Sequence, residues 1–155
     1  MARVQLELPE QFLFSITQTV RMTDLNVGGH VGNDQMISLL SEARYRFFCH
    51  YGYDEFSKEK LGIVITDLVT AYRSESFAQE NLRFEVGLMD FNKYGADIIF
   101  RVTKHPSGQV VVLAKQGFVF FDYQTHKVTQ VPESFRRTFV RPVPRAQTSV
   151  AMSSV

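Results

Sequence analysis

The sequence predicts an α+β fold in which one long helix packs against an antiparallel sheet of about five strands. Three observations support this fold class. The segment from Asn33 to about Tyr51 is the one stretch with the apolar spacing of a long helix. Beyond it, the apolar period changes from 3.6 to 2, as is typical of strands. Short turns separate these strands, which predicts antiparallel neighbours.

Size and composition indicate one globular domain over residues 1–140, followed by a loose Pro-, Ser- and Thr-rich tail over 141–155. The net charge of +1, without long runs of either sign, gives no reason to expect nucleic acid or a membrane as partner. The single cysteine, Cys49, excludes an internal disulfide and a cysteine zinc site. With no signal peptide or membrane-spanning run, we expect a cytoplasmic protein.

The first elements are a strand, a loop and the long helix. Apolar and polar side chains alternate from Phe12 to Arg21, which favours a half-buried strand. A polar, glycine-rich loop follows, and the helix is expected to begin at Asn33 or Asp34, either of which can cap free N–H groups. Gly52 is expected to end the helix. The predicted apolar face consists of Met36, Leu39, Leu40, Ala43 and Phe47.

The rest of the chain reads as strands. They are predicted over residues 63–73, 82–88, 96–103 and 110–123, with turns at 92–95 and 105–108. A short helical turn is expected within 53–61, and a terminal helix within 132–139. The long apolar strand 110–123 suggests that both of its faces are covered, by the helix and by a partner subunit.

The loop and helix carry a recognisable pattern. A strand ends in Val20-Arg21-x-x-Asp24-x-Asn26-x-x-Gly29-His30-Val31-x-Asn33, and the helix contains Glu42-Ala43-Arg44. This resembles the hotdog-fold acyl thioesterases, most closely the 4-hydroxybenzoyl-CoA thioesterase family. The resemblance covers about residues 12–123 and implies a sheet wrapped around one helix. It also implies a homodimer or homotetramer with sites at the subunit interface.

The chain departs from the family loop, which commonly reads Asp-x-Asp-x-x-Gly-His-Val-Asn-Asn-x-x-Tyr. The second Asp, which carries catalysis in the 4-hydroxybenzoyl-CoA branch, is here Asn26, and an amide cannot act as a base or nucleophile. Gly32 replaces the first Asn, and Met36 the Tyr. His30 is retained. Glu42 falls where other branches have a helix glutamate implicated in catalysis.

Thioester hydrolysis needs an activated water or nucleophile, a group that stabilises the oxyanion, and an acyl pocket. The helix start offers free N–H groups and a partial positive charge for the carbonyl oxygen. Gly28 and Gly29 let a substrate approach the backbone, and we include both glycines and Met36 among the substrate-binding residues. This chemistry requires no metal and no organic cofactor.

Glu42 is the preferred base, because at ~100° per residue it lies at the edge of the apolar stripe. The alternative is an ordinary ion pair with Arg46 one turn later. Asp24 is the second candidate carboxylate, or else a residue that binds loop N–H groups. The remaining catalytic candidates also have plain alternatives as loop or capping residues: His30, which would orient the base or the carbonyl, Asn33 and Asn26.

Coenzyme A carries phosphates, and Arg73, Lys93, Arg83 and Arg101 are the candidate cations, each of which has the alternative of a solvated side chain. Phe118, Phe120 and Phe121 are candidates for an acyl or aryl pocket, with the alternative of plain core. A thiol nucleophile at Cys49-His50 is disfavoured, because the pair lies at the far end of the helix from the loop.

The sequence therefore predicts a thioester hydrolase, acting on acyl-CoA or on an acyl-carrier-protein thioester, that works as a homo-oligomer. The alternative is a non-hydrolytic acyl-thioester binding module, and Asn26 motivates it. A hydratase is disfavoured, because such enzymes have an Asp and a His five residues apart in a different motif.

Overall fold

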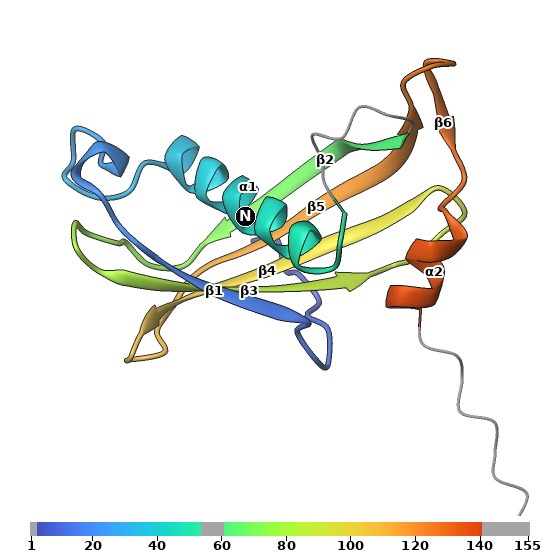
Figure 1. Cartoon of the computed structure of the whole chain (residues 1–155). Helices are drawn as coiled ribbons and strands as arrows, with labels where there is room; N and C mark the ends of the chain where they lie inside the picture. Colours follow the sequence, from blue (N-terminus) through green and yellow to red (C-terminus); the bar gives the residue numbers. More distant parts are fainter. Residues whose placement is uncertain (1–2, 54–60, 141–155) are drawn as a thin grey trace, which may run out of the picture.

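The computed structural model describes residues 3–53 and 61–140. The elements follow the chain in this order: β1 (Phe14–Thr19), the 3-10 turn η1 (Met22–Asp24), α1 (Asn33–His50), β2 (Leu61–Tyr72), β3 (Asn81–Met89), β4 (Gly95–His105), β5 (Val110–Asp122), β6 (Lys127–Thr129) and α2 (Glu133–Phe139). Figure 1 shows α1 lying across one face of a curved sheet, with α2 at one end of it. The predicted α+β architecture is confirmed.

All strand pairs of the sheet are antiparallel, and the strand order is β1-β3-β4-β5-β2, with β6 added beside β5. The turns β3–β4 and β4–β5 join neighbours, as predicted. The expectation that all four later strands form neighbours in sequence is wrong for β2 and β3. Their connection, residues 73–80, crosses β5 and β4. Three strand spacings amount to roughly 14 Å, which eight residues span easily.

The buried face of α1 is the predicted one, and it holds the helix on the sheet. Met36, Leu39, Leu40, Ala43 and Phe47 are all buried, and Phe48 joins them. These side chains meet the inward residues of the strands, such as Phe84 on β3 and Phe100 on β4. Burying this continuous apolar surface is the main force that fixes the helix position.

The helix begins at Asn33, but the predicted side-chain cap is absent. Gly32 is the N-cap residue, and no side chain within residues 3–53 and 61–140 makes a cap hydrogen bond at this end. Asn33 and Asp34 already lie inside the first turn, so neither can serve as the cap. The first-turn N–H groups of α1 therefore face the loop without a capping acceptor. The C-terminal prediction is confirmed, because Gly52 has a φ of +85° just after the helix.

Aromatic rings fill the core below the C-terminal half of α1. Phe48 lies 5.8 Å from Phe118, and Phe135 of α2 lies 5.0 Å from Phe120, measured between ring centroids.

Strand β6 was not anticipated from the sequence. The helical turn expected within 53–61 and the tail 141–155 fall on residues outside the described ranges, except for Tyr53, which is in no helix, and Leu61, which begins β2.

Candidate functional site

The loop before α1 is built around Asn26 and two glycines. Asn26 Oδ1 accepts a hydrogen bond from the N–H of Gly28 over 3.0 Å, and the Asn26 N–H donates to the His30 carbonyl over 2.8 Å. Gly29 has a φ of +80°, which favours glycine at this turn. The Asn26 amide thus shapes the loop. This is the loop role that the sequence offered as the alternative to catalysis.

Asp24 is 1% exposed and lies below the loop. Its carboxylate accepts the Arg21 N–H at 2.8 Å and the Arg21 Nη2 at 2.9 Å. The hydrogen bond from the Arg21 side chain is the main cause that lowers the pKa of Asp24, with the backbone bond adding to it. The oxygens are occupied, and Asp24 does not line the cleft described next. The geometry favours the loop-building alternative.

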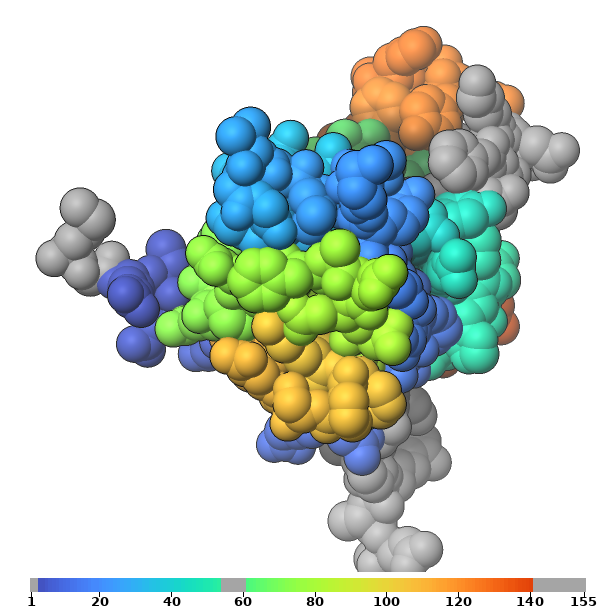
Figure 2. Space-filling view, turned by 90° about the vertical axis from the view of Figure 1, so that its left-hand side faces the viewer, coloured from blue at the N-terminus to red at the C-terminus, as the bar shows by residue number. Residues whose placement is uncertain are grey.

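A cleft of about 310 Å³ opens beside the start of α1. The loop forms one wall, and the connection 73–80 lies next to it, as Figure 2 shows from this end of the molecule. The Val31 N–H donates to the Ser76 carbonyl over 2.9 Å and ties the two walls together. The lining residues are His30, Val31, Asn33, Met36, Tyr72, Arg73, Ser74, Glu75, Ser76, Val111 and Val112.

This cleft brings together four residues that the sequence singled out: His30, Asn33, Met36 and Arg73. Asn33 is the first residue of α1, so the partial positive charge of the helix start faces the cleft. The volume lies at the lower end of the range of small-molecule sites. Valines and Met36 supply its apolar surface, and its polar groups come from the loop, the first residue of α1, the end of β2 and the connection 73–80.

The surroundings of His30 favour one tautomer of the neutral ring. Nδ1 lies 3.2 Å from the Val31 carbonyl oxygen, which can only accept, so a hydrogen bond there requires the hydrogen on Nδ1. Nε2 is then left with a lone pair. It lies 3.8 Å from Glu75 Oε1, a distance suited to an ion pair once the ring is protonated. The cleft therefore holds a proton acceptor with a carboxylate beside it.

Glu75 and Ser76 are among the cleft residues that were not singled out as site candidates. Ser76 is 2% exposed, and its Oγ is the one buried side-chain polar atom without a hydrogen-bond partner among the described residues. No periodicity marks either residue, because both belong to an irregular connection. A signal that was available is the unusual density of polar groups in Tyr72-Arg73-Ser74-Glu75-Ser76 directly after a strand.

Glu42 lies elsewhere. It lines a separate groove between α1 and β1, together with Arg21, Arg46 and residues of β1. Its Oε1 accepts from Arg46 Nε over 2.7 Å, and its side chain is 44% exposed. Within one chain, Glu42 does not lie in the cleft with His30. The ion pair between Glu42 and Arg46, which the sequence offered as the alternative to catalysis, is present.

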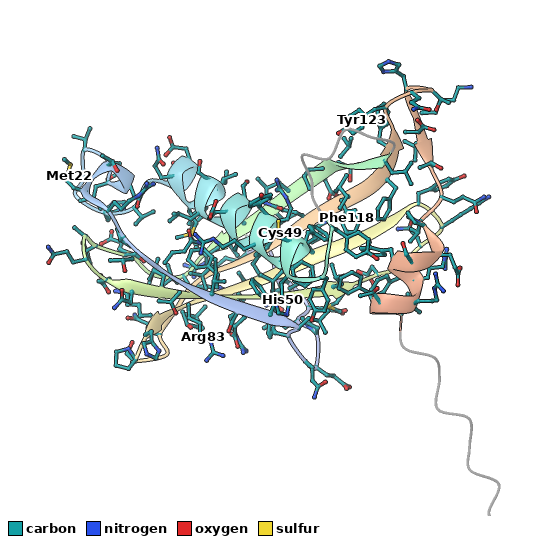
Figure 3. The ribbon with its side chains drawn as sticks, viewed as in Figure 1. Met22, Cys49, His50, Arg83, Phe118 and Tyr123 are labelled. Atoms are coloured by element: carbon teal, nitrogen blue, oxygen red, sulfur yellow. The ribbon has the colours of Figure 1, made fainter. Side chains whose placement is uncertain are left out.

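The other proposed phosphate-binding cations are dispersed. Lys93 lies in the β3–β4 turn, at the opposite end of the sheet from the helix start (Figure 1), with its Nζ over the Tyr94 ring. Arg101 pairs with Glu85 at 2.6 Å and covers the Phe12 ring. Figure 3 shows Arg83 on the side of the sheet that faces away from α1. Of the four cations, Arg73 alone lines the cleft.

The remaining candidates are also accounted for. Cys49 and His50 lie at the far end of α1 from the loop near Met22, as expected from their spacing (Figure 3). Phe118 and Phe120 pack into the aromatic core, Phe121 packs against Tyr123, and none of the three lines the cleft. None of the helices in residues 3–53 and 61–140 is long and apolar enough to cross a bilayer.

Comparison with known proteins agrees with this picture. The family model of the thioesterase-like superfamily matches residues 20–139. No curated protein matches the sequence significantly. Among solved structures, the probable thioesterase YbaW of Escherichia coli is 25% identical with a TM-score of 0.70, and the match covers 79% of this chain and 93% of that one.

Two further structures resemble the chain in fold. The 1,4-dihydroxy-2-naphthoyl-CoA thioesterase Slr0204 of Synechocystis has a TM-score of 0.76 at 12% identity, over 83% of this chain and 98% of that one. A predicted thioesterase from Bacillus stearothermophilus has a TM-score of 0.74 at 17% identity, over 82% and 93%. These structures confirm the hotdog fold predicted from the sequence. Because the family model spans most of the chain, the protein belongs to the thioesterase-like superfamily.

Proposed function

We propose that the chain hydrolyses an acyl thioester of coenzyme A or of an acyl-carrier protein in the cleft beside the start of α1. The observation that carries the proposal is the position of His30, which presents a free Nε2 beside an uncapped helix start. A proton acceptor and a place for negative charge are two of the three features that thioester hydrolysis requires, and the acyl pocket is the third.

The carbonyl oxygen would lie at the first turn of α1. Gly32 has no side chain to occupy the free N–H groups, so they are left for a ligand. Their partial positive charge stabilises the oxyanion as it forms in the transition state. Removing one such donor in other enzymes costs about 10²- to 10³-fold in turnover.

His30 is the proposed general base. Its Nε2 takes a proton from a water molecule, whose oxygen attacks the carbonyl carbon. The tetrahedral intermediate then collapses, the carbon–sulfur bond breaks, and the thiolate takes the proton back from the imidazolium. Glu75, 3.8 Å from Nε2, stabilises the imidazolium between these steps. Glu42, the base expected from sequence, is kept as the competing candidate, and the variants described below separate the two.

The cleft also supports a substrate orientation. Val31, Met36, Val111 and Val112 form an apolar surface for the acyl group. Arg73 is the cleft residue with a positive charge and suits an anionic group on the carrier portion. The modest volume favours a short acyl chain or a single aromatic ring within one chain's share of the site.

The second candidate function is acyl-thioester binding without hydrolysis. The observation in its favour is Asn26, which occupies the position of the family's catalytic carboxylate and is engaged in the loop. The two functions differ in a single measurement, the release of free thiol. We expect thiol release from at least one member of a panel of short-chain, medium-chain and aryl acyl-CoAs. Binding without release on every member would support the binding module.

A homodimer or homotetramer is part of the proposal, as is a cytoplasmic location. Strand β2 supports the oligomer, because no other described strand pairs with its outer edge. It is long and apolar, with Val64 and Leu68 each 38% exposed. Such an edge favours pairing with a second strand.

A further inference from the structure

We infer that the hydroxyl of Ser76 is a substrate-binding group of the cleft, which donates a hydrogen bond to the carbonyl oxygen of the acyl thioester. The inference rests on the proposed substrate class, but it does not require that the bound thioester be hydrolysed. It assigns a role to a residue that neither the helix nor the loop pattern marks.

The first observation is the state of the hydroxyl. Ser76 is 2% exposed, and its Oγ has no hydrogen-bond partner among the described residues. A buried polar group without a partner is destabilising, because its bonds to water are lost and nothing replaces them. An alanine at this position would avoid that cost, so the serine calls for an explanation outside the described residues.

The neighbouring serine makes the comparison direct. Ser74 lines the same cleft from the same connection, but its Oγ donates to the Val110 carbonyl over 2.7 Å. That bond fastens the connection to β5. Of these two serines, Ser74 has a hydroxyl that holds the fold, whereas the hydroxyl of Ser76 has no hydrogen-bond partner among the described residues.

The backbone of Ser76 lies next to the loop that leads into α1. Its carbonyl accepts the Val31 N–H at 2.9 Å, which fixes its backbone directly beside the loop that leads into α1. The side chain is left with rotation about one torsion, among three staggered positions. Ser76 and Asn33 both line the cleft, so the inferred hydrogen bond and the N–H groups of α1 would act on one carbonyl oxygen from the two walls.

The chemistry of the donor selects the ligand group. A neutral hydroxyl in a cleft that valines and Met36 also line suits a neutral acceptor such as a thioester carbonyl. An anionic phosphate is better matched by Arg73, which also lines the cleft. The bond would strengthen as charge builds on the carbonyl oxygen during attack.

The test uses two ligands of equal chain length on the full chain. One is an acyl-CoA analogue in which a CH₂ group replaces the thioester sulfur, so that it keeps the carbonyl and resists hydrolysis. The other is an S-alkyl-CoA, which lacks the carbonyl. Calorimetry gives the affinity of each for the wild type, Ser76→Ala and Ser74→Ala. Thermal unfolding of each protein is measured in parallel.

We expect Ser76→Ala to weaken the carbonyl ligand by roughly 5- to 20-fold and to leave the S-alkyl ligand unchanged. Its melting temperature should stay equal to the wild type or rise, because an unpaired buried hydroxyl is removed. Ser74→Ala should lower the melting temperature and should not discriminate between the ligands. A merely structural role for Ser76 would instead lower its melting temperature and affect both ligands alike.

Equal affinities of wild type and Ser76→Ala for the carbonyl ligand would overturn the inference, as would equal losses for both ligands. Thiol release by the wild type is scored separately. If the wild type discriminates through Ser76 but releases no thiol, the inference stands and hydrolysis fails. If it releases thiol and the variant binds normally, hydrolysis stands and the inference fails. Wild type that binds neither ligand overturns both.

Discussion

Tyr72, the last residue of β2, donates its phenolic hydrogen to the carbonyl oxygen of Asn33, the first residue of α1, over 2.7 Å. The bond joins the edge of the sheet to the start of the helix. Both residues line the cleft, so the bond sets the distance between its walls at the point where the helix N–H groups are free.

Tyr72→Phe removes this bond and keeps the ring. We expect the free energy of unfolding to fall by about 0.5–1 kcal/mol, near the lower end for a hydrogen bond because Tyr72 is 47% exposed. Turnover should fall several-fold, since the helix start is less well positioned. Urea unfolding and thiol release measure the two effects. Tyr123→Phe is the matched control, and an equal loss in both variants would contradict the role given to Tyr72.

His30 and Glu42 compete for the role of base, and single variants separate them. His30→Gln should reduce kcat by about 10²- to 10⁴-fold, the range typical of general-base catalysis. Glu42→Gln should stay within about threefold of wild type, because Glu42 faces a different groove and pairs with Arg46. Steady-state thiol release on the best substrate measures both. The reverse ranking would return the base to Glu42.

The sequence was sufficient for most of the fold, because periodicity reports burial directly. The apolar face of α1 and the strand limits follow from spacings of 3.6 and 2. The pairing of β2 with β5 does not follow from these spacings, because the spacings do not tell which strand lies at which edge of the sheet. A connection such as 73–80 is compatible with either arrangement, and tertiary packing decides between them.

The site was predictable only in part, for a similar reason. A helical angle places Glu42 at an edge of the apolar stripe but does not say which strand faces that edge. His30 and Asn33 were found because the loop motif names them. Ser76 was not found, because what marks it is a buried hydroxyl without a hydrogen-bond partner among the described residues, and this depends on the folded structure.

The Asp24 carboxylate should make the free energy of unfolding decrease at low pH. Its pKa is lowered in the folded state, first by the Arg21 side chain, below an unfolded value of about 3.9. The stabilisation is thus complete above about pH 4 and is lost as the pH falls through the folded pKa. Arg21 is mostly exposed, which weakens the pair.

Asp24→Asn should therefore cost about 1–2 kcal/mol at pH 7, and the gap from wild type should narrow below pH 4. Urea unfolding from pH 7 down to pH 3 measures this gap. Glu7→Gln, at an exposed carboxylate, is the control and should show no such narrowing. A gap that is constant with pH would show that the Asp24 carboxylate charge does not matter.

The open edge of β2 leads to a prediction about assembly. Leu68→Lys places a charge on this strand, and charges on edge strands oppose pairing with another chain. We expect the wild type to sediment as a dimer or tetramer and Leu68→Lys to shift toward the monomer. Val128→Lys on β6 is the matched control, because Val128 is also an exposed apolar strand residue but lies on a strand of three residues. Sedimentation velocity at several protein concentrations measures the shift.

If both variants keep the wild-type mass, β2 is not the contact between subunits. If only Leu68→Lys dissociates and its turnover falls in proportion, the cleft beside the start of α1 needs the second chain for activity.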